Sequence, residues 1–273
     1  MLVLTYYCNI NLSNIHNTEM AAAGNLDITN LDITVSASRH CSVECNCKNG
    51  NHTECIAAWL RTPDALQGCV SVSFRDADID MAAIAKIINR QFSDIVYLNY
   101  KSHSDFRGVS DVFPNLVELV CNYTYKLHSL AGIETLKLVK LQATDNNLSD
   151  LAPLKAHPSL QTLDLTGNRI KDLDLSAIAS LRLSKLQCNM CFLTNLDFLK
   201  GHQTLITLHC WHNQIVSLAG LAGMTTLREL RCNNNNLSTL KDIEGLTLDC
   251  IDVSSNPIQD CADSDILKGD GKI

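Results

Sequence analysis

The sequence predicts an α/β solenoid, in which an array of parallel β-strands on a concave face is preceded by an N-terminal cap that contains helices. A leucine-based pattern recurs seven times at an almost constant interval, and each copy contains a short stretch of alternating apolar and polar residues. The 273-residue chain is 46% hydrophobic but only 5% aromatic, so it can bury a large core with few large side chains. This composition excludes a disordered tail or a miniprotein held by disulfides alone.

The repeat follows the pattern L-x-x-L-x-L-x-x-N-x-L. Its copies begin at Leu116, Leu138, Leu160, Leu183, Leu205, Leu227 and Leu248. Because side chains alternate between the two faces of a strand, the L-x-L segment points its leucines inward and the residue between them outward. Strands of successive coils then pair in parallel about 4.8 Å apart, and no coil buries its apolar face alone. We therefore expect one cooperative array over residues 116–260.

The asparagine of the pattern follows the strand, where its amide can bond backbone groups that a turn leaves unpaired. Asn168 and Asn213 are therefore expected to be buried in a stack of turns. Thr124 and Cys191 replace asparagine in two copies. We expect those two turns to be held less firmly and the coil of Cys191 to be the least regular.

These residues resemble the leucine-rich repeat family, most closely the class with repeats of about 22 residues that occurs in phosphatase regulatory subunits and bacterial internalins. The segment from Asp150 to Leu154 is similar to the returning D-x-x-P-L segment of the internalin pattern. The resemblance covers about residues 116–260. It implies a binding module rather than an enzyme, and it implies no particular partner.

The flanks differ from the repeats. Residues 1–40 show no repeat and are predicted to be irregular or disordered, and residues 261–273 are predicted to be a short tail. Residues 41–115 are predicted to form the N-terminal cap, which grades into irregular repeats and covers the exposed end of the array. Within the cap we expect one helix over residues 53–61 and a second one capped by Asp80.

Charge and hydropathy restrict the partners. The 22 Lys and Arg residues and 29 Asp and Glu residues give a net charge of −7 without a block of like charges. This balance argues against nucleic acid or an anionic membrane as the partner. No apolar run reaches the roughly 18 residues of a membrane helix, and residues 1–7 lack the features of a signal peptide. We expect a monomer that is not exported by the general route.

The chain has 13 cysteines, and four of them occupy inward strand positions of the repeats: Cys121, Cys188, Cys210 and Cys232. They are predicted to be buried, reduced and unreactive. Three of these lie on consecutive coils, where neighbouring thiols suit a reducing compartment. This favours a cytoplasmic location.

The other notable group is Cys41, Cys45, Cys47 and Cys55, with His52 between. Three interpretations stay open: free structural thiols, disulfides or a zinc site. The spacing resembles the disulfide-bonded cap of extracellular leucine-rich repeat proteins, which would imply a secreted receptor-like or adhesion module. The zinc alternative would imply a zinc-binding or catalytic protein that uses the array as a substrate platform.

Catalytic motifs do not emerge from the sequence, which contains no glycine-rich phosphate loop, H-E-x-x-H or G-x-S-x-G. The most reactive segment is the run from His209 to His212, which contains Cys210. Strand alternation sends Cys210 inward and His209 outward, so the two cannot act as nucleophile and base. We expect no enzyme activity, no metal and no cofactor.

Trp211 is the most informative outward residue, because the outward positions around it are mostly small or polar. A large ring bordered by histidine, methionine and arginine resembles the anchors that dominate protein interfaces. The predicted partner-binding residues are Trp211, His209, His212, Arg231, Gln187, Met190 and Asn233. The sequence thus predicts a non-catalytic module that binds a protein on its concave face. A regulatory subunit or a bacterial effector delivered into a host cell would fit this description.

Overall fold

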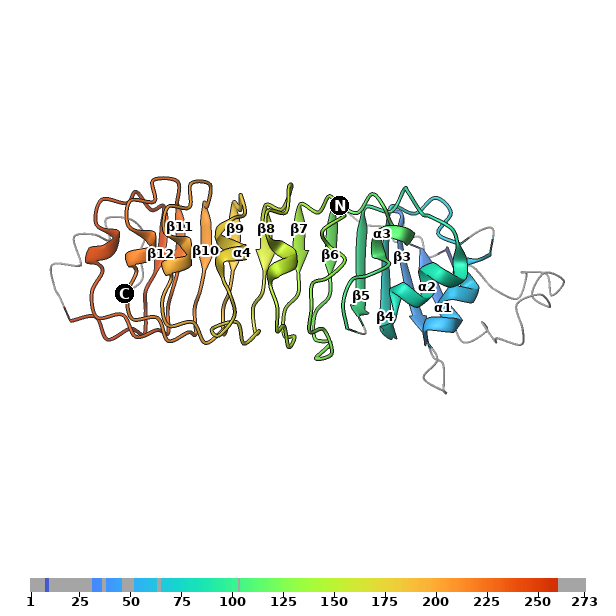
Figure 1. Cartoon of the computed structure of the whole chain (residues 1–273), viewed down its shortest axis with the longest axis horizontal. Coiled ribbons are helices and arrows are strands. Elements are labelled where there is room, and N and C mark those ends of the chain that lie inside the picture. Colours follow the sequence, from blue (N-terminus) through green and yellow to red (C-terminus); the bar gives the residue numbers. More distant parts are fainter. Residues whose placement is uncertain are drawn as a thin grey trace. The chain divides into compact units, whose positions relative to one another are not determined.

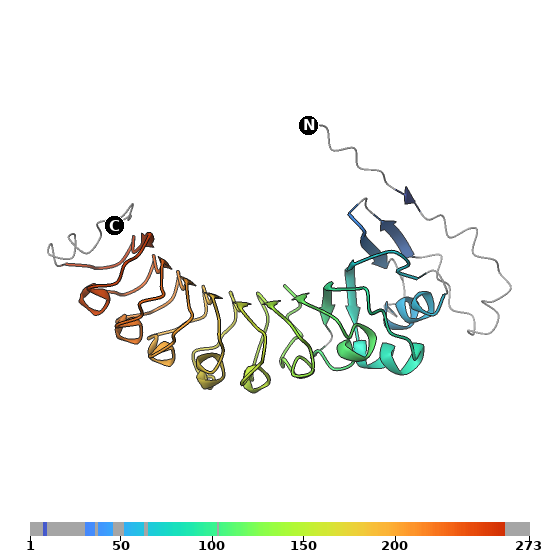
Figure 2. The same ribbon diagram turned by 90° about the horizontal axis from the view of Figure 1, so that it is seen from above.

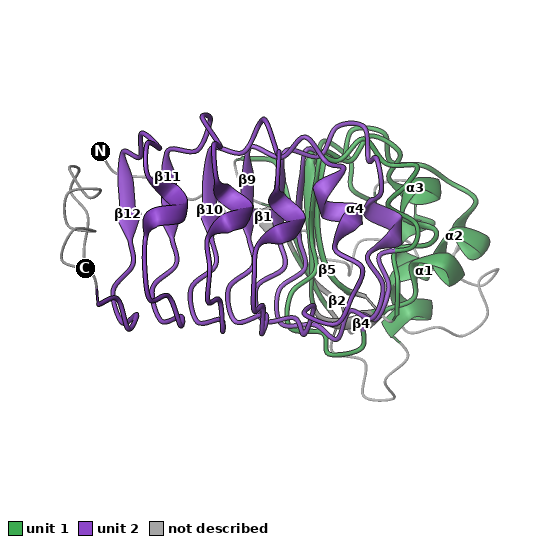
Figure 3. Ribbon diagram, turned by 60° about the vertical axis from the view of Figure 1, so that its left-hand side comes forward, with its two compact units in different colours: residues 1–126, 131–138 green, residues 127–130, 139–273 purple. Residues whose placement is uncertain are grey.

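The computed structural model describes residues 8–9, 31–35, 38–45, 52–62, 65–102 and 104–259. The chain divides into two compact units (Figure 3). Unit 1 comprises residues 1–126 and 131–138, and unit 2 comprises residues 127–130 and 139–273. Most of the predicted lead-in and all of the predicted tail lie outside the described residues, so the division at residues 40, 115 and 260 stays a prediction.

Unit 1 contains six of the strands: β1 Cys8–Asn9, β2 Leu31–Val35, β3 His40–Cys45, β4 Ser71–Ile79, β5 Tyr97–Ser102 and β6 Glu118–Val120 (Figure 1). The pairings of β1 with β2 and of β2 with β3 are antiparallel. From β3 to β6 each strand pairs in parallel with the next. The parallel, repeat-like order therefore begins within the predicted cap.

The described residues of unit 1 also include three helices: α1 His52–Leu60, α2 Met81–Ile88 and α3 Val109–Val112. The two helices predicted for the cap are thus present. Asp80 caps α2, since its carboxylate accepts a hydrogen bond of 3.0 Å from the backbone N–H of Ala83. Trp59 on α1 is 4% exposed, as expected for a core residue of the cap.

Unit 2 contains strands β7 Lys140–Gln142, β8 Thr162–Asp164, β9 Lys185–Gln187, β10 Thr207–His209, β11 Glu229–Arg231 and β12 Cys250–Asp252. Each pairs in parallel with the next, in register, so that Leu208 lies opposite Leu186 and Leu230. Within this unit the strands line the inner, concave side (Figure 2). The predicted strands and their parallel arrangement are confirmed.

Short helices return each coil along the outer side of unit 2: η4 Ala152–Leu154, α4 Ser176–Ala179, η5 Asp197–Leu199, η6 Ala219–Leu221 and η7 Lys241–Ile243 (Figure 2). They pack closely on one another. A Cβ added to Gly220 would meet the carbonyl oxygen of Leu196 in the preceding coil, so this position accepts only glycine.

The core of unit 2 is a continuous stack of inward leucines, in which Leu163, Leu186, Leu208 and Leu230 are fully buried. The predicted burial of the repeat leucines is confirmed at every start from Leu116 to Leu227. Leu248 is the exception, because it is half-buried in the last coil that the structure describes.

The turn asparagines join neighbouring coils. The Asn168 side-chain nitrogen donates to the carbonyls of Leu165 in its own coil, at 2.9 Å, and Ala143 in the coil before, at 2.8 Å. Its side-chain oxygen accepts from the backbone N–H of Leu148 at 3.5 Å. Asn168 is fully buried as expected, whereas Asn213 makes the corresponding bonds while partly exposed, so its predicted burial is wrong.

Cys191 occupies the same position with different chemistry. Its thiol is fully buried, and its single S–H donates to one of two carbonyl oxygens, those of Leu165 and Asn189, which both lie 3.2 Å from the sulfur. The following residue, Phe192, has a φ of 62°, and Tyr125 after Thr124 has a φ of 53°. No other copy has a positive φ at this position among the described residues. The two turns without asparagine are therefore the irregular ones, as expected.

The four inward cysteines of the repeats, Cys121, Cys188, Cys210 and Cys232, are all fully buried. Burial raises the pKa of Cys188 and of Cys210 well above the usual value, and it raises the pKa of Cys232 to about 12. The expected burial is confirmed, and the lack of reactivity that follows from it stays a prediction.

Candidate protein-binding surface

All seven residues predicted to bind a partner lie in unit 2. Gln187, His209 and Arg231 end strands β9, β10 and β11, where they form one in-register row. Met190, Trp211, His212 and Asn233 follow in the turns just beyond these strands. Parallel pairing alone brings the seven positions onto three consecutive coils.

Trp211 is half-buried and is held by several contacts. Its backbone N–H donates to the side-chain oxygen of Asn189 at 3.1 Å, and its carbonyl accepts from the N–H of Met190 at 3.1 Å. Its ring meets the His212 ring edge-on, with centroids 5.3 Å apart and planes at 76°. Met190 beside it is 42% exposed. The backbone of Trp211 is therefore held in place while the residue stays partly open to solvent.

His209 and Arg231 meet through Glu229, which sequence reasoning missed. One carboxylate oxygen of Glu229 lies 3.0 Å from Nε2 of His209 and 2.8 Å from Nε of Arg231. Partial burial raises the pKa of Glu229, but the two partners outweigh it, and the net shift is downward. Alternation along β11 places Glu229 on the same face as Arg231, and this signal could have identified it.

Gln187 and Asn233 flank this group. Gln187 is partly buried in the row below His209, and its backbone carbonyl accepts from the N–H of Leu165 at 2.9 Å. The carbonyl of Asn233 accepts from the N–H of His212 at 3.0 Å. Both side chains remain partly accessible at the border of the surface.

Phe192 extends the surface and was also missed. Its ring is 40% exposed, and the guanidinium carbon of Arg169 in the preceding coil lies 5.1 Å from the ring centroid. The positive φ of Phe192 accompanies the loss of asparagine at Cys191. That departure from the repeat pattern was the available signal.

On the surface around Trp211, Cys210 and His209 do not form a pair of nucleophile and general base. Cys210 is fully buried, whereas His209 points outward, as strand alternation predicts. In the described part of the chain, no group of three His, Cys, Asp or Glu side chains could hold a metal ion. Cys41 and Cys55 are buried on β3 and α1, and the side chains of Cys45 and Cys47 lie outside the described residues. The zinc interpretation of that cluster therefore stays open.

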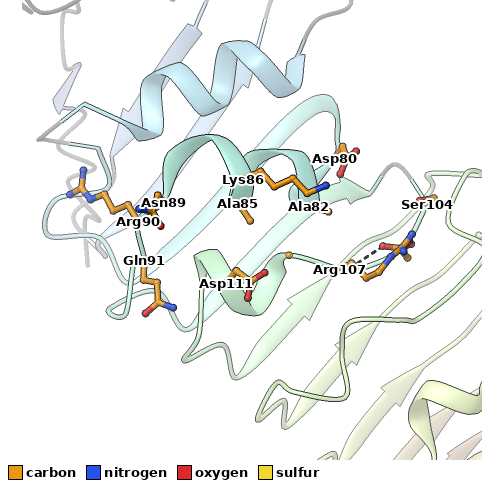
Figure 4. Close-up of a pocket in the computed structure, with 12 residues that line it drawn as sticks. Asp80, Ala82, Ala85, Lys86, Asn89, Arg90, Gln91, Ser104, Arg107 and Asp111 are labelled. Carbon is orange, nitrogen blue, oxygen red and sulfur yellow. Dashed lines mark hydrogen bonds and ion pairs between the residues drawn. The ribbon is translucent and has the colours of Figure 1, made fainter. Parts of the chain in front are cut away.

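Unit 1 has a separate hollow of about 970 Å³ beside α2 and α3 (Figure 4). Its charged lining mixes Lys86, Arg90 and Arg107 with Asp80, Asp105 and Asp111. Arg107 donates to Asp105 at 2.9 Å. With this mixture of charges and no large apolar side chain, the hollow has the character of a solvated groove rather than an enclosed ligand site.

The search for membrane segments covered the described residues, and none of their helices is long and apolar enough to cross a bilayer. A family model described as leucine-rich repeats, two copies, matches residues 136–180 and 203–248. A comparison with curated proteins found no match.

Solved structures show the fold. An internalin, inlF, from Listeria monocytogenes is 23% identical, with a TM-score of 0.61, and the match covers 79% of this chain and 69% of that one. An internalin C2, inlC2, from the same organism is 26% identical, with a TM-score of 0.45, over 68% of this chain and 70% of that one. The first match supports the architecture derived above. The chain thus contains leucine-rich repeats over residues 136–180 and 203–248, and its fold is similar to that of an internalin.

Proposed function

We propose that this protein is a non-catalytic module that binds another protein through the surface around Trp211. The observation that carries the proposal is the half-buried Trp211, whose backbone pairs with that of the preceding coil, where two apolar side chains, Met190 and Phe192, are exposed. Rigid aromatic anchors bind with little loss of side-chain entropy, and they dominate the energetics of protein interfaces.

The polar border supports the same function. The group of His209, Glu229 and Arg231 is internally paired, so a partner meets oriented polar atoms at the edge of an apolar centre. An apolar centre with a polar rim is the usual anatomy of a protein interface. A regulatory subunit or an effector delivered into a host cell is the role that best fits such a module.

The buried thiols support a cytoplasmic location. Cys188, Cys210 and Cys232 are stacked on consecutive coils without access to solvent. Such neighbours persist as thiols most readily where the surroundings are reducing. Thiol counting in protein extracted under alkylating conditions tests this location, since disulfides among these three would contradict it.

The test of binding begins with affinity capture from the native lysate, followed by titration of the identified partner. Trp211→Ala is expected to weaken binding by about 2 kcal/mol or more, with smaller losses for Arg231→Ala and His209→Ala. Thermal stability should change little. Lys200→Ala, at an exposed position directly after η5, is the control and should bind as wild type does. A partner that binds Trp211→Ala as tightly as wild type would refute the proposed site.

A further inference from the structure

Cys41 and Cys69 come together at one end of the β3–β4 pair in unit 1. The two strands are parallel and in register, with Cys41 opposite Val72, and Cys69 lies three residues before Val72. The backbone N–H of Val70 donates to the carbonyl of Arg39 at 3.0 Å, which holds the two segments together just before the strands. Nothing in the sequence pattern connects these two cysteines, since the spacing of Cys41 groups it with its near neighbours.

The two side chains are in direct contact. Their sulfur atoms share a hydrogen bond, and each residue is only 1% exposed. A disulfide requires two Cα atoms within about 7 Å and side chains that point toward each other. Two thiols that share a hydrogen bond meet the second requirement.

The environment makes the two thiols unequal. The hydrogen bond from Cys41 lowers the pKa of Cys69, burial opposes this effect, and the nearby positive charge of Arg39 adds to it. The same hydrogen bond, together with burial, raises the pKa of Cys41. The Arg39 guanidinium is kept in place by its hydrogen bond to the carbonyl of Gly68. Cys69 is therefore the thiol that ionises first, and a thiolate is the nucleophile in exchange reactions.

Access to Cys69 is through the turn that precedes it. Gln67 and Gly68 are exposed, as is Arg39 on the other side of the pair. Exposed turns open locally at a lower free energy than buried strands do, and such opening would give a small reagent access to Cys69. The repeat thiol Cys210 is fully buried as well, but burial raises its pKa well above the usual value, so it stays protonated.

We propose that Cys41 and Cys69 form a reversible disulfide by exchange with a low-molecular-weight disulfide. The Cys69 thiolate attacks one sulfur of the reagent, a Cys69 mixed disulfide forms, and the first small thiolate leaves. Cys41 then gives up its proton to solvent and attacks Cys69 Sγ, which expels the second small thiolate. The two cysteines lose two electrons in total, and the reagent gains them as it becomes two small thiols.

The cross-link would close a loop over residues 41–69, which contains all of α1. Closing a loop of this length restricts the unfolded chain and stabilises the folded one. Oxidation is therefore expected to raise the midpoint of thermal unfolding of unit 1, and a reductant should reverse the change.

The first experiment maps the link with oxidised glutathione as the reagent. The full chain is oxidised, alkylated without reductant and digested with trypsin, which leaves Cys41 on peptide 40–48 and Cys69 on peptide 62–75. Because the first peptide also contains Cys45 and Cys47, the experiment uses the Cys45→Ser/Cys47→Ser background. The expected product is the 40–48 peptide joined to the 62–75 peptide. Alkylation of both Cys41 and Cys69 after oxidation would overturn the proposal, as would a link from Cys69 to Cys55.

The second experiment tests the two roles in the same background. Cys41→Ser is expected to trap glutathione on Cys69, whereas Cys69→Ser should leave Cys41 unmodified over the same time. Equal adducts on both variants would overturn the assignment of Cys69 as nucleophile. Cys210→Ser is the matched control and should still form the link. Circular dichroism verifies folding, and Cys41→Ala and Cys69→Ala replace any serine variant that fails to fold.

Discussion

At Asn213 and at Cys191, two consecutive coils of unit 2 leave their strands along similar paths but with different hydrogen bonds. The Asn213 amide donates to the carbonyls of Cys188 and Cys210 and accepts from the backbone N–H groups of Cys191 and Leu193. The Cys191 sulfur lies 3.2 Å from two carbonyl oxygens, one of them in the preceding coil, but its single S–H can donate to only one of them at a time. The sulfur is also a weak acceptor for the backbone N–H groups of Gly167 and Asn168, so the thiol replaces the amide with fewer and weaker hydrogen bonds.

The comparison shows how little of the asparagine bonding the turn requires. The fewer and weaker hydrogen bonds of one thiol are enough to keep the turn and the strands on both sides of it, since β8, β9 and β10 stay in register. What changes is the residue after the turn, where Phe192 takes a positive φ and its ring is partly exposed. The irregular turn thus leaves the core intact and changes the surface.

The largest expected effects concern the buried leucines of the two strands that lead into these turns. Their loss should destabilise the two coils equally. Leu186→Ala in the coil of Cys191 and Leu208→Ala in the coil of Asn213 remove fully buried side chains. Each should lower the free energy of unfolding by about 2 to 5 kcal/mol, measured by urea denaturation, because the stacked coils cannot collapse into the cavity. A cost at Leu186 far below that at Leu208 would mean that the irregular coil is also loosely packed.

The next largest effect is expected from a substitution that disrupts the regular turn at Asn213. Asn213→Ala leaves the carbonyls of Cys188 and Cys210 without their side-chain donor and removes the acceptor for two N–H groups. We expect a loss of about 1 to 3 kcal/mol in the same measurement. Gln214→Ala, at the exposed neighbouring position, is the control and should cost little. Equal stability of Asn213→Ala and wild type would show that the turn bonds contribute nothing.

The converse substitution converts the irregular turn into a regular one. Cys191→Asn restores an amide oxygen for the coil before it, and we expect a gain of about 1 kcal/mol in the free energy of unfolding. The variant should also bind the partner less well, because Phe192 loses the conformation that accompanies the thiol. Destabilisation by Cys191→Asn would show that the site is shaped for sulfur and cannot hold the amide.

The smallest effect depends on pH. Burial raises the pKa of the Cys191 thiol from 9.0 to about 12. Its contribution to stability is therefore complete below pH 9.0 and is lost as the pH rises from 9.0 toward 12, because the unfolded chain releases the proton first. Near the lower limit the loss amounts to a few tenths of a kcal/mol. Urea midpoints from pH 7 upward should fall more for wild type than for Cys191→Asn, and parallel curves would contradict the buried thiol.

The repeats of unit 2 could be predicted from the sequence because their period and inward leucines depend on local alternation. The coil of Cys191 is one that the repeat pattern alone does not identify. The matched family model covers residues 136–180 and 203–248, and the unmatched stretch between them contains Cys191. That coil is nevertheless built as its neighbours are, since the strand β9 pairs on both sides. The Cys191 thiol takes the place of the asparagine there, although a pattern of letters counts the cysteine only as a mismatch.

The candidate surface was predictable in position but not in its bonding. Trp211 stood out because large outward residues are rare in the array, whereas Glu229 looked like an ordinary strand residue. Its role depends on distances to His209 in one coil and Arg231 in its own, and these are known only once the coils are stacked. Contact between Cys41 and Cys69 likewise depends on the register of β3 and β4, which the irregular spacing of the cap does not encode.

The Cys191 turn also bears on how cooperatively unit 2 unfolds. Stacked coils behave as a chain of nearest-neighbour couplings, and such a chain opens first where one coupling is weakest. The junction between the coils that begin at Leu160 and Leu183 has the thiol in place of the amide, so local opening should start there while the coils on either side stay folded. Met190 and Phe192, two exposed apolar residues of the proposed binding surface, flank Cys191. The junction with the weakest coupling in unit 2 and part of the proposed binding surface therefore belong to the same coil.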